Sequence, residues 1–174
     1  MFDSIQKPAM TGHETELPVF YLKAGDIFVT EKSFKVSTVL GSCVSVTMFS
    51  ERFGIAAICH ALMPVCIERA LCVVSCADPF KYVNCVVPDM VRRMQSHGVS
   101  PKDIETKLFG GSDMFRIGTG RERALSVGKL NIEAAVNAVR TENLVLKVTD
   151  VGGEFGRKIF FYTNTGEVWL KRLK

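Results

Sequence analysis

Cys43 and His60 are the pair of residues in this sequence whose types and spacing best suit chemistry. Cys43 follows the small residues Gly41 and Ser42, which allow a tight turn and bring main-chain amides close to the next side chain. An imidazole beside a thiol can take the thiol proton, and the thiolate then attacks acyl carbon atoms. The protonated imidazole can return that proton to an amine or ammonia leaving group.

A β-hairpin is the element that would position the two groups. Residues 43–49 and 54–60 are strand-like runs on either side of residues 50–53. A hairpin symmetric about that loop pairs Phe49 with Gly54 and, further along, Val46 with Ala57, Val44 with Cys59, and Cys43 with His60. Directly opposed residues share a face with their Cβ atoms roughly 5 Å apart. Side chains alternate along a strand, so Cys59 is expected on the opposite face.

A third group usually fixes the imidazole of such a pair. The hydroxyls of Ser37 and Thr38 lie on the strand that enters the Cys43 loop, and either is a candidate. The backbone amides around Ser42 and Cys43 are candidates for an oxyanion site, where charge develops during acyl transfer.

Four further cysteines lie outside the predicted hairpin: Cys66, Cys72, Cys76 and Cys85. They lack paired two-residue spacing and nearby histidines, so buried thiols are favoured over a zinc site, and no metal or cofactor is expected. Gly110-Gly111 and Gly152-Gly153 are most simply turns. The simpler interpretation of Cys43 must also be considered, because a cysteine in an apolar strand is more often an inert core residue than a nucleophile.

Composition limits the context of this chemistry. The chain has 174 residues, 47% of them hydrophobic, which suits one domain with a single core. We expect residues 1–16 to be a flexible tail and residues 17–174 to form the domain. No secretion signal or membrane-spanning run is evident, which predicts a cytoplasmic protein with reduced thiols and no membrane insertion. The net charge of +4 is scattered, so an acidic protein partner fits better than nucleic acid.

The periodicity predicts strands and two helices. Strands are expected at 19–22, 26–30, 34–40 and 107–109 and, near the end, at 144–148, 158–162 and 167–173. One amphipathic helix spans about 82–94, where Pro88 leaves the start uncertain, and ends by Gly98. A second helix is expected after an N-cap at Asn131, and residues 112–128 should form an exposed loop.

Motifs along nearly the whole chain after about residue 20 resemble those of the CheD family of chemoreceptor glutamine deamidases. Several motifs in the right order are far more specific than any one of them. They are Leu40-Gly41-Ser42-Cys43-Val44, His60 with Leu62-Met63-Pro64, Lys81-Tyr82-Val83, Lys107-Leu108-Phe109-Gly110-Gly111, Gly128-Lys129-Leu130-Asn131, Asp150-Val151-Gly152-Gly153 with Gly156-Arg157-Lys158, and Gly166-Glu167-Val168.

The resemblance implies hydrolysis of a receptor glutamine side-chain amide to glutamate and ammonia, through a thioester on cysteine. Cys43 and His60 fall on the family's nucleophile and base. The implied substrates are the cytoplasmic domains of methyl-accepting chemoreceptors in bacterial or archaeal chemotaxis. The fold it implies is α+β, with layered, mainly antiparallel sheets in a sandwich-like arrangement covered by two α-helices, similar to glutamine-deamidating toxin domains.

The chain departs from the family pattern in three places. The family has a threonine six residues before the cysteine, where this chain has Ser37 with Thr38 adjacent. A one-residue shift of the strand would turn all its side chains over, so Ser37 is the expected third catalytic residue and Thr38 the alternative. The Cys66 to Cys76 region also differs, and residues 112–126 resemble an insertion.

Two other functions fit the same sequence. The family resemblance also implies binding to a CheC-type phosphatase, so the chain could act as a regulatory partner with little or no catalysis. A generic cysteine peptidase is a weaker alternative, which the identity of the reaction product would exclude.

Overall fold

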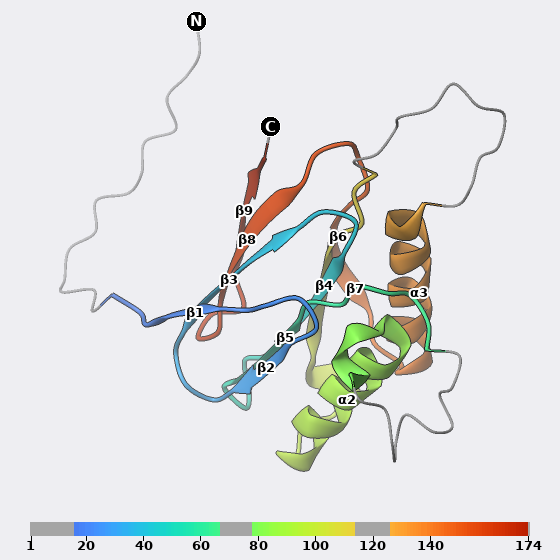
Figure 1. The fold of residues 1–174 in the computed structure, drawn as a ribbon. Helices are drawn as coiled ribbons and strands as arrows, with labels where there is room; N and C mark the ends of the chain where they lie inside the picture. The colour runs from blue at the N-terminus through green and yellow to red at the C-terminus, as the bar shows by residue number, and fades with distance from the viewer. Residues whose placement is uncertain (1–15, 67–77, 114–125, 174) are drawn as a thin grey trace, which may run out of the picture.

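The computed structural model describes residues 16–66, 78–113 and 126–173, which form three layers (Figure 1). A four-stranded sheet packs on a five-stranded sheet, and two helices cover the far side of the five-stranded sheet. The expected α+β fold, with mainly antiparallel sheets covered by two helices, is confirmed. None of the described helices is both long and apolar enough to cross a membrane.

The four-stranded sheet has the strand order β1-β3-β8-β9. Its strands are β1 (Val19–Tyr21), β3 (Lys35–Leu40), β8 (Arg157–Tyr162) and β9 (Val168–Arg172). Only the β1–β3 pair is parallel. Its inner side is apolar because alternate residues of each strand, such as Val36, Leu40, Ile159 and Phe161, are buried between the sheets.

The five-stranded sheet has the order β2-β5-β4-β6-β7. It consists of β2 (Ile27–Thr30), β5 (Ile55–Cys59), β4 (Val44–Ser50), β6 (Glu105–Gly110) and β7 (Leu146–Val151), with only β6–β7 parallel. Both faces of β4 and β5 are buried, one against the other sheet and one against the helices, so these central strands carry no charged residue and their only polar side chains are the hydroxyls of Ser45, Thr47 and Ser50.

The helices α2 (Val83–Ser96) and α3 (Val127–Thr141) pack on this sheet and on each other. Pro88 lies inside α2, where its missing N–H leaves the carbonyl of Asn84 without the usual intrahelical partner. The packing of α2 through Val86, Val87 and Met90 outweighs that loss. The short 3₁₀ helices η1 (Pro79–Lys81) and η2 (Pro101–Asp103) flank α2.

The expected N-cap of α3 at Asn131 is wrong. The N-cap lies five residues earlier, at Ser126, whose hydroxyl accepts a hydrogen bond from the amide of Lys129. Gly128 is in the first turn because a side chain there would meet the carbonyls of Gly111 and Ser112. Asn131 is thus a buried residue of the helix interior, with a different role.

The hairpin register also differs from the sequence prediction. Thr47 pairs with Ile58 and Val44 bridges to Ala61, so the strands are offset by two residues from the symmetric pairing. The cause is Gly54, which takes a positive φ of 61° and closes a turn over residues 51–54, so that Ser50 pairs with Ile55. A two-residue offset preserves the faces but changes the partners.

Several sequence predictions fall outside the described residues. They concern the N-terminal tail to residue 15, Cys72 and Cys76, and nearly all of the expected 112–126 insertion.

Candidate functional site

Cys43 and His60 lie at neighbouring strand ends and on the same face of the five-stranded sheet. The observed register places His60 opposite Ser45 and Cys43 opposite Leu62, so the thiol and imidazole are diagonal neighbours rather than the direct pair that we predicted. Diagonal positions are about 7–8 Å apart at Cα, within reach of an aromatic side chain such as the imidazole of His60. Both side chains are on the face of the five-stranded sheet that packs against the four-stranded sheet.

Cys59 lies on the other face, as predicted. It is fully buried in the core between the five-stranded sheet and the helices. Burial raises the pKa of its thiol to about 12, which makes it a poor source of thiolate. The two cysteines of the hairpin therefore differ in both direction and chemistry.

Thr38, not Ser37, contacts the imidazole. The Oγ1 atom of Thr38 lies 2.7 Å from Nδ1 of His60 and 2.9 Å from the carbonyl oxygen of Leu22. Ser37 points to the outer side of its sheet, and its buried hydroxyl has no hydrogen-bond partner in the described part of the chain. The expectation that Ser37 fixes His60 is wrong, because the core face of β3 consists of Val36, Thr38 and Leu40.

The two hydrogen bonds of Thr38 together assign the tautomer of His60. A carbonyl oxygen only accepts, so the single hydroxyl proton of Thr38 is donated to Leu22. The Thr38 oxygen must then accept from Nδ1–H of His60. That leaves Nε2 without a proton, and an unprotonated nitrogen is what a general base requires.

The ionisation of both groups is shifted toward the neutral forms. Burial lowers the pKa of His60 from its ordinary value of 6.5, and the nearby carboxylate of Asp26 partly opposes this. Burial raises the pKa of Cys43, and the amide of Cys43 itself partly opposes that. At neutral pH the resting pair is therefore a thiol beside an imidazole, which suits proton transfer during attack rather than before it.

The loop that carries Cys43 is held through its carbonyl groups. The amide of Ser112 donates to Gly41 at 2.8 Å, and the amide of Gly111 donates to Cys43 at 2.7 Å. Asn131 donates from Nδ2 to the carbonyl of Ser42 at 2.9 Å. Three consecutive carbonyls are thus occupied, which fixes Gly41 and Ser42 beside the thiol.

Asn131 is, after Ser37, a second residue of the site whose predicted role was wrong. Its Nδ2 also donates to the carbonyl of Leu62 at 2.9 Å, so both amide protons are used. One side chain therefore joins the loop before Cys43 to the segment after His60. The sequence contains one sign of this role, because Asn131 is a polar residue on the same helical face as the apolar residues Ala135 and Val139. A polar side chain buried on such a face needs hydrogen-bond partners.

Ser45 is a second residue that the sequence analysis passed over. It lies opposite His60, is fully buried, and its hydroxyl has no protein hydrogen-bond partner in the described ranges. It places a further hydroxyl on the face shared by Cys43 and His60.

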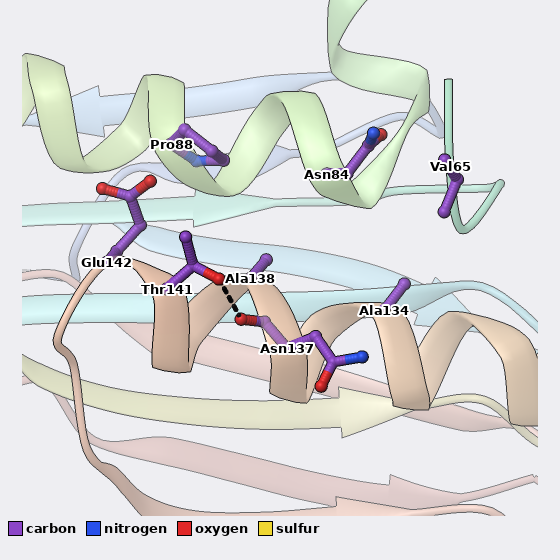
Figure 2. A pocket seen from close by; sticks show the side chains of 8 residues that line it. All are labelled: Val65, Asn84, Pro88, Ala134, Asn137, Ala138, Thr141 and Glu142. Carbon is purple, nitrogen blue, oxygen red and sulfur yellow. Dashed lines mark hydrogen bonds between the residues drawn. The ribbon is translucent and has the colours of Figure 1, made fainter. Parts of the chain in front are cut away.

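A cavity elsewhere in the molecule does not coincide with these residues. It has a volume of about 160 Å³ and lies between α2 and α3, where Figure 2 shows Asn84 and Pro88 facing Asn137 and Thr141. Thr141 donates within its own helix to the carbonyl of Asn137, as the dashed line marks. Neither Cys43 nor His60 lines this cavity.

Comparison with known proteins points to one family. The model of the family described as "CheD chemotactic sensory transduction" matches residues 74–172. The chain is 44% identical over 164 residues to a Geobacter sulfurreducens protein named probable chemoreceptor glutamine deamidase CheD 2, covering 94% of this chain and 96% of that protein. It is 37% identical to the Oleidesulfovibrio alaskensis protein named probable chemoreceptor glutamine deamidase CheD, covering 90% and 74% of the two chains.

Among solved structures, the chain is similar to the Bacillus licheniformis hypothetical protein YfiH. The TM-score is 0.43 and the identity 14%, with 71% of this chain covered. The match spans about half of that protein, 49% of its chain.

Proposed function

Since this chain belongs to the CheD family, we propose that it is a chemoreceptor glutamine deamidase with Cys43 as nucleophile, His60 as base and Thr38 as the residue that orients His60. Its substrates would be glutamine side chains on the cytoplasmic domains of chemoreceptors, and it would act in the cytoplasm. The observation that carries the proposal is the chain of contacts from the Leu22 carbonyl through Thr38 to Nδ1 of His60.

The first step is attack on the glutamine amide. As the sulfur of Cys43 bonds to the amide carbon, the thiol proton passes to Nε2 of His60. The resulting imidazolium donates from Nδ1 to Thr38, whose oxygen stays oriented by the Leu22 carbonyl. The amides of Ser42 and Cys43 are the proposed donors to the oxyanion of the tetrahedral intermediate, because they adjoin the attacking sulfur and the loop that carries them is held in place through its carbonyls.

Collapse of the intermediate releases ammonia. Nε2–H of His60 protonates the departing nitrogen, the C–N bond breaks, and a thioester on Cys43 remains. Water then attacks the thioester while His60 accepts its proton. The C–S bond breaks, the thiol is restored, and the net reaction converts an amide and water into a carboxylate and ammonium.

Mass analysis of a purified receptor cytoplasmic fragment tests the proposal. The expected result is a gain of mass that corresponds to conversion of amide to acid, with ammonia released in equal amount. Cys43→Ala should abolish both, whereas Cys59→Ala, which removes the thiol of the other face, should retain them. Unchanged ammonia release from Cys43→Ala would show that another group is the nucleophile, and a cleaved fragment would instead indicate a peptidase.

Binding to a CheC-type phosphatase is a separate proposal that rests on the family resemblance. It predicts that a purified phosphatase of that class is retained by the chain and by its Cys43→Ala variant alike. Retention together with undetectable deamidation would make the chain a regulatory partner, and absence of retention would remove this proposal without affecting the deamidase.

A further inference from the structure

The four-stranded sheet has an outer face that no described helix covers. Both helices contact the five-stranded sheet, and the outer sheet lies on the opposite side of the molecule (Figure 1). Its inner residues form the core between the sheets, so the alternate residues of β1, β3, β8 and β9 face away from the protein.

The register places three aromatic side chains in one row on this face, with Phe160 and Trp169 adjacent and Tyr21 separated from Phe160 by Ser37. Tyr21 pairs with Ser37, Ser37 with Phe160, and Phe160 with Trp169, which makes one row across all four strands. The exposed fractions of Tyr21 and Trp169 are 70% and 57%, and those of Val39 and Val19 in the flanking rows are 52% and 47%. Contiguous exposed apolar residues, with Tyr and Trp among them, are typical of binding surfaces.

Three lysines lie among these residues. The Nζ atoms of Lys35 and Lys158 lie 5.1 and 5.2 Å from the ring centre of Phe160, and Lys171 pairs with Lys158 across β8–β9. No ion pair joins these lysines to a carboxylate in the described residues. The strands place no Asp or Glu on the face, and Glu167, just before β9, lies at its end beside Tyr162.

We propose that this aromatic and lysine face, formed by Tyr21, Val39, Phe160, Trp169, Lys35, Lys158 and Lys171, docks an acidic, amphipathic helical segment of a protein partner. The apolar row would bury the apolar stripe of the segment, and the lysines would face carboxylates on its flanks. Thr38 points the other way from Ser37 and Val39 on the same strand, so docking leaves Cys43 and His60 uncovered. The proposal therefore does not depend on deamidation.

The only tryptophan of the chain, Trp169, is part of the face and gives a local signal of binding. The probe is a synthetic amphipathic helical peptide of leucine and glutamate, titrated into the full chain, with a leucine and lysine peptide of the same pattern as its control. The expected result is a saturable change in Trp169 fluorescence with the acidic peptide, which weakens as salt is added.

Variants locate the interaction. Lys171→Glu should weaken binding of the acidic peptide at least about tenfold, and Tyr21→Ser should weaken it as well. Lys102→Glu, the same charge reversal at an exposed lysine of η2, should leave it unchanged. Cys43→Ala should bind as the unaltered chain does.

Four outcomes would overturn the proposal. They are equal binding of the basic peptide, equal effects of Lys171→Glu and Lys102→Glu, tighter binding of a single-stranded oligonucleotide than of the acidic peptide, and self-association in sedimentation that Tyr21→Ser abolishes. The last would assign the face to a second copy of this chain.

Discussion

At the scale of single residues, the site depends on one buried hydroxyl. The hydroxyl of Thr38 donates a hydrogen bond to the Leu22 carbonyl and accepts one from Nδ1–H of His60. Because all three groups are buried, no nearby solvent replaces a lost partner at low cost. The neighbouring Ser37 has the same functional group without either contact.

Thr38→Val should therefore abolish most deamidase activity and cost about 1–3 kcal/mol of unfolding free energy, since it leaves a carbonyl and an imidazole N–H unpaired. Thr38→Ser should recover much of both, because it restores the hydroxyl. Ser37→Ala is the matched control and should change activity little. Activity assays with denaturant unfolding would measure this, and a larger loss in Ser37→Ala than in Thr38→Val would contradict the geometry.

The pH dependence of the proposed reaction follows from His60. Burial lowers its pKa below 6.5, so the neutral base persists into mildly acidic solution and the acid limb of kcat/KM should lie below pH 6.5. Asp26→Asn removes the carboxylate that raises this pKa and should move the limb further down. The pH profile, with NMR titration of the ring, measures the shift, and Glu51→Gln at the far hairpin turn should leave it in place. A limb above pH 6.5 would exclude His60 as the base.

The same shift has a consequence for stability. A histidine that binds its proton less tightly when folded favours unfolding as it becomes charged. The contribution of neutral His60 to the stability of the fold is fully present above pH 6.5, and it is lost as the pH falls below that value through the pKa of His60 in the folded protein.

At the scale of elements, the Cys43 loop depends on how closely β6 approaches it. Gly110 has a φ of 106°, and a Cβ atom there would lie 2.2 Å from the carbonyl oxygen of Cys43. Gly153 also has a positive φ, of 75°, but nothing lies within 4 Å of its added Cβ. Substitutions at the two glycines thus distinguish backbone strain alone from backbone strain combined with displacement of Cys43.

Gly110→Ala should reduce activity strongly, because the carbonyl that the new methyl group would strike belongs to Cys43, the proposed nucleophile. Gly153→Ala should cost only the strain of its backbone, about 1–2 kcal/mol, with little loss of kcat. Thermal unfolding and deamidation rates of both variants test this. Equal loss of activity in the two would mean that the close contact is not what positions Cys43.

The elements were largely predictable from the sequence, whereas their exact partners were not. Alternation and helical periodicity located the strands and both helices, and they placed Cys43 and His60 on one face with Cys59 on the other. The predicted hairpin register was wrong by two residues because the prediction placed Gly54 in a strand. Glycine at the end of a loop is typical of a turn with positive φ, which is where Gly54 lies. Asn131 was misassigned because capping and buried hydrogen bonding favour the same residue type.

The choice of Ser37 over Thr38 was avoidable. Phe34, Val36 and Leu40 alternate with Lys35, Ser37 and Val39 in the sequence, so the apolar set already places Thr38 on the core face. Family spacing outweighed this local pattern in the prediction. The contact with Leu22, by contrast, joins segments that only the folded sheet brings together, and no local pattern predicts it.

At the scale of the whole molecule, Arg157 links the two sheets. It comes from β8 of one sheet, is fully buried, and pairs with Asp150 on β7 of the other. It also donates to the carbonyls of Asp150 and Gly152 and, at 3.0 Å, to Ser112, whose amide holds the carbonyl of Gly41. Arg157 therefore both joins the two sheets and, through Ser112, supports the loop before Cys43.

Arg157→Met should destabilise the fold by about 1–3 kcal/mol, because it leaves the carbonyls of Asp150 and Gly152 without their donor, while the Asp150 carboxylate keeps its ion pair with Arg172. Activity should fall with it at temperatures where the variant is still folded. The exposed pair of Arg92 with Asp89 is the control, and Arg92→Ala should cost less than about 1 kcal/mol. Unfolding at low and high salt tests both. A loss in Arg157→Met as small as that in Arg92→Ala would show that the buried pair does not join the sheets.

The peptide unit at Leu22 has a consequence for how the protein tolerates mutation. Its N–H donates to the carbonyl of Ser37 at 2.9 Å, while its carbonyl accepts from Thr38, so main-chain atoms supply the last link behind the imidazole. No substitution at position 22 deletes either group unless it introduces proline. A saturation mutagenesis survey should thus find position 22 sensitive to side-chain volume, because Leu22 is buried, and indifferent to hydrogen-bonding type. The orientation of the His60 imidazole therefore depends on the path of the backbone rather than on the side chain at position 22.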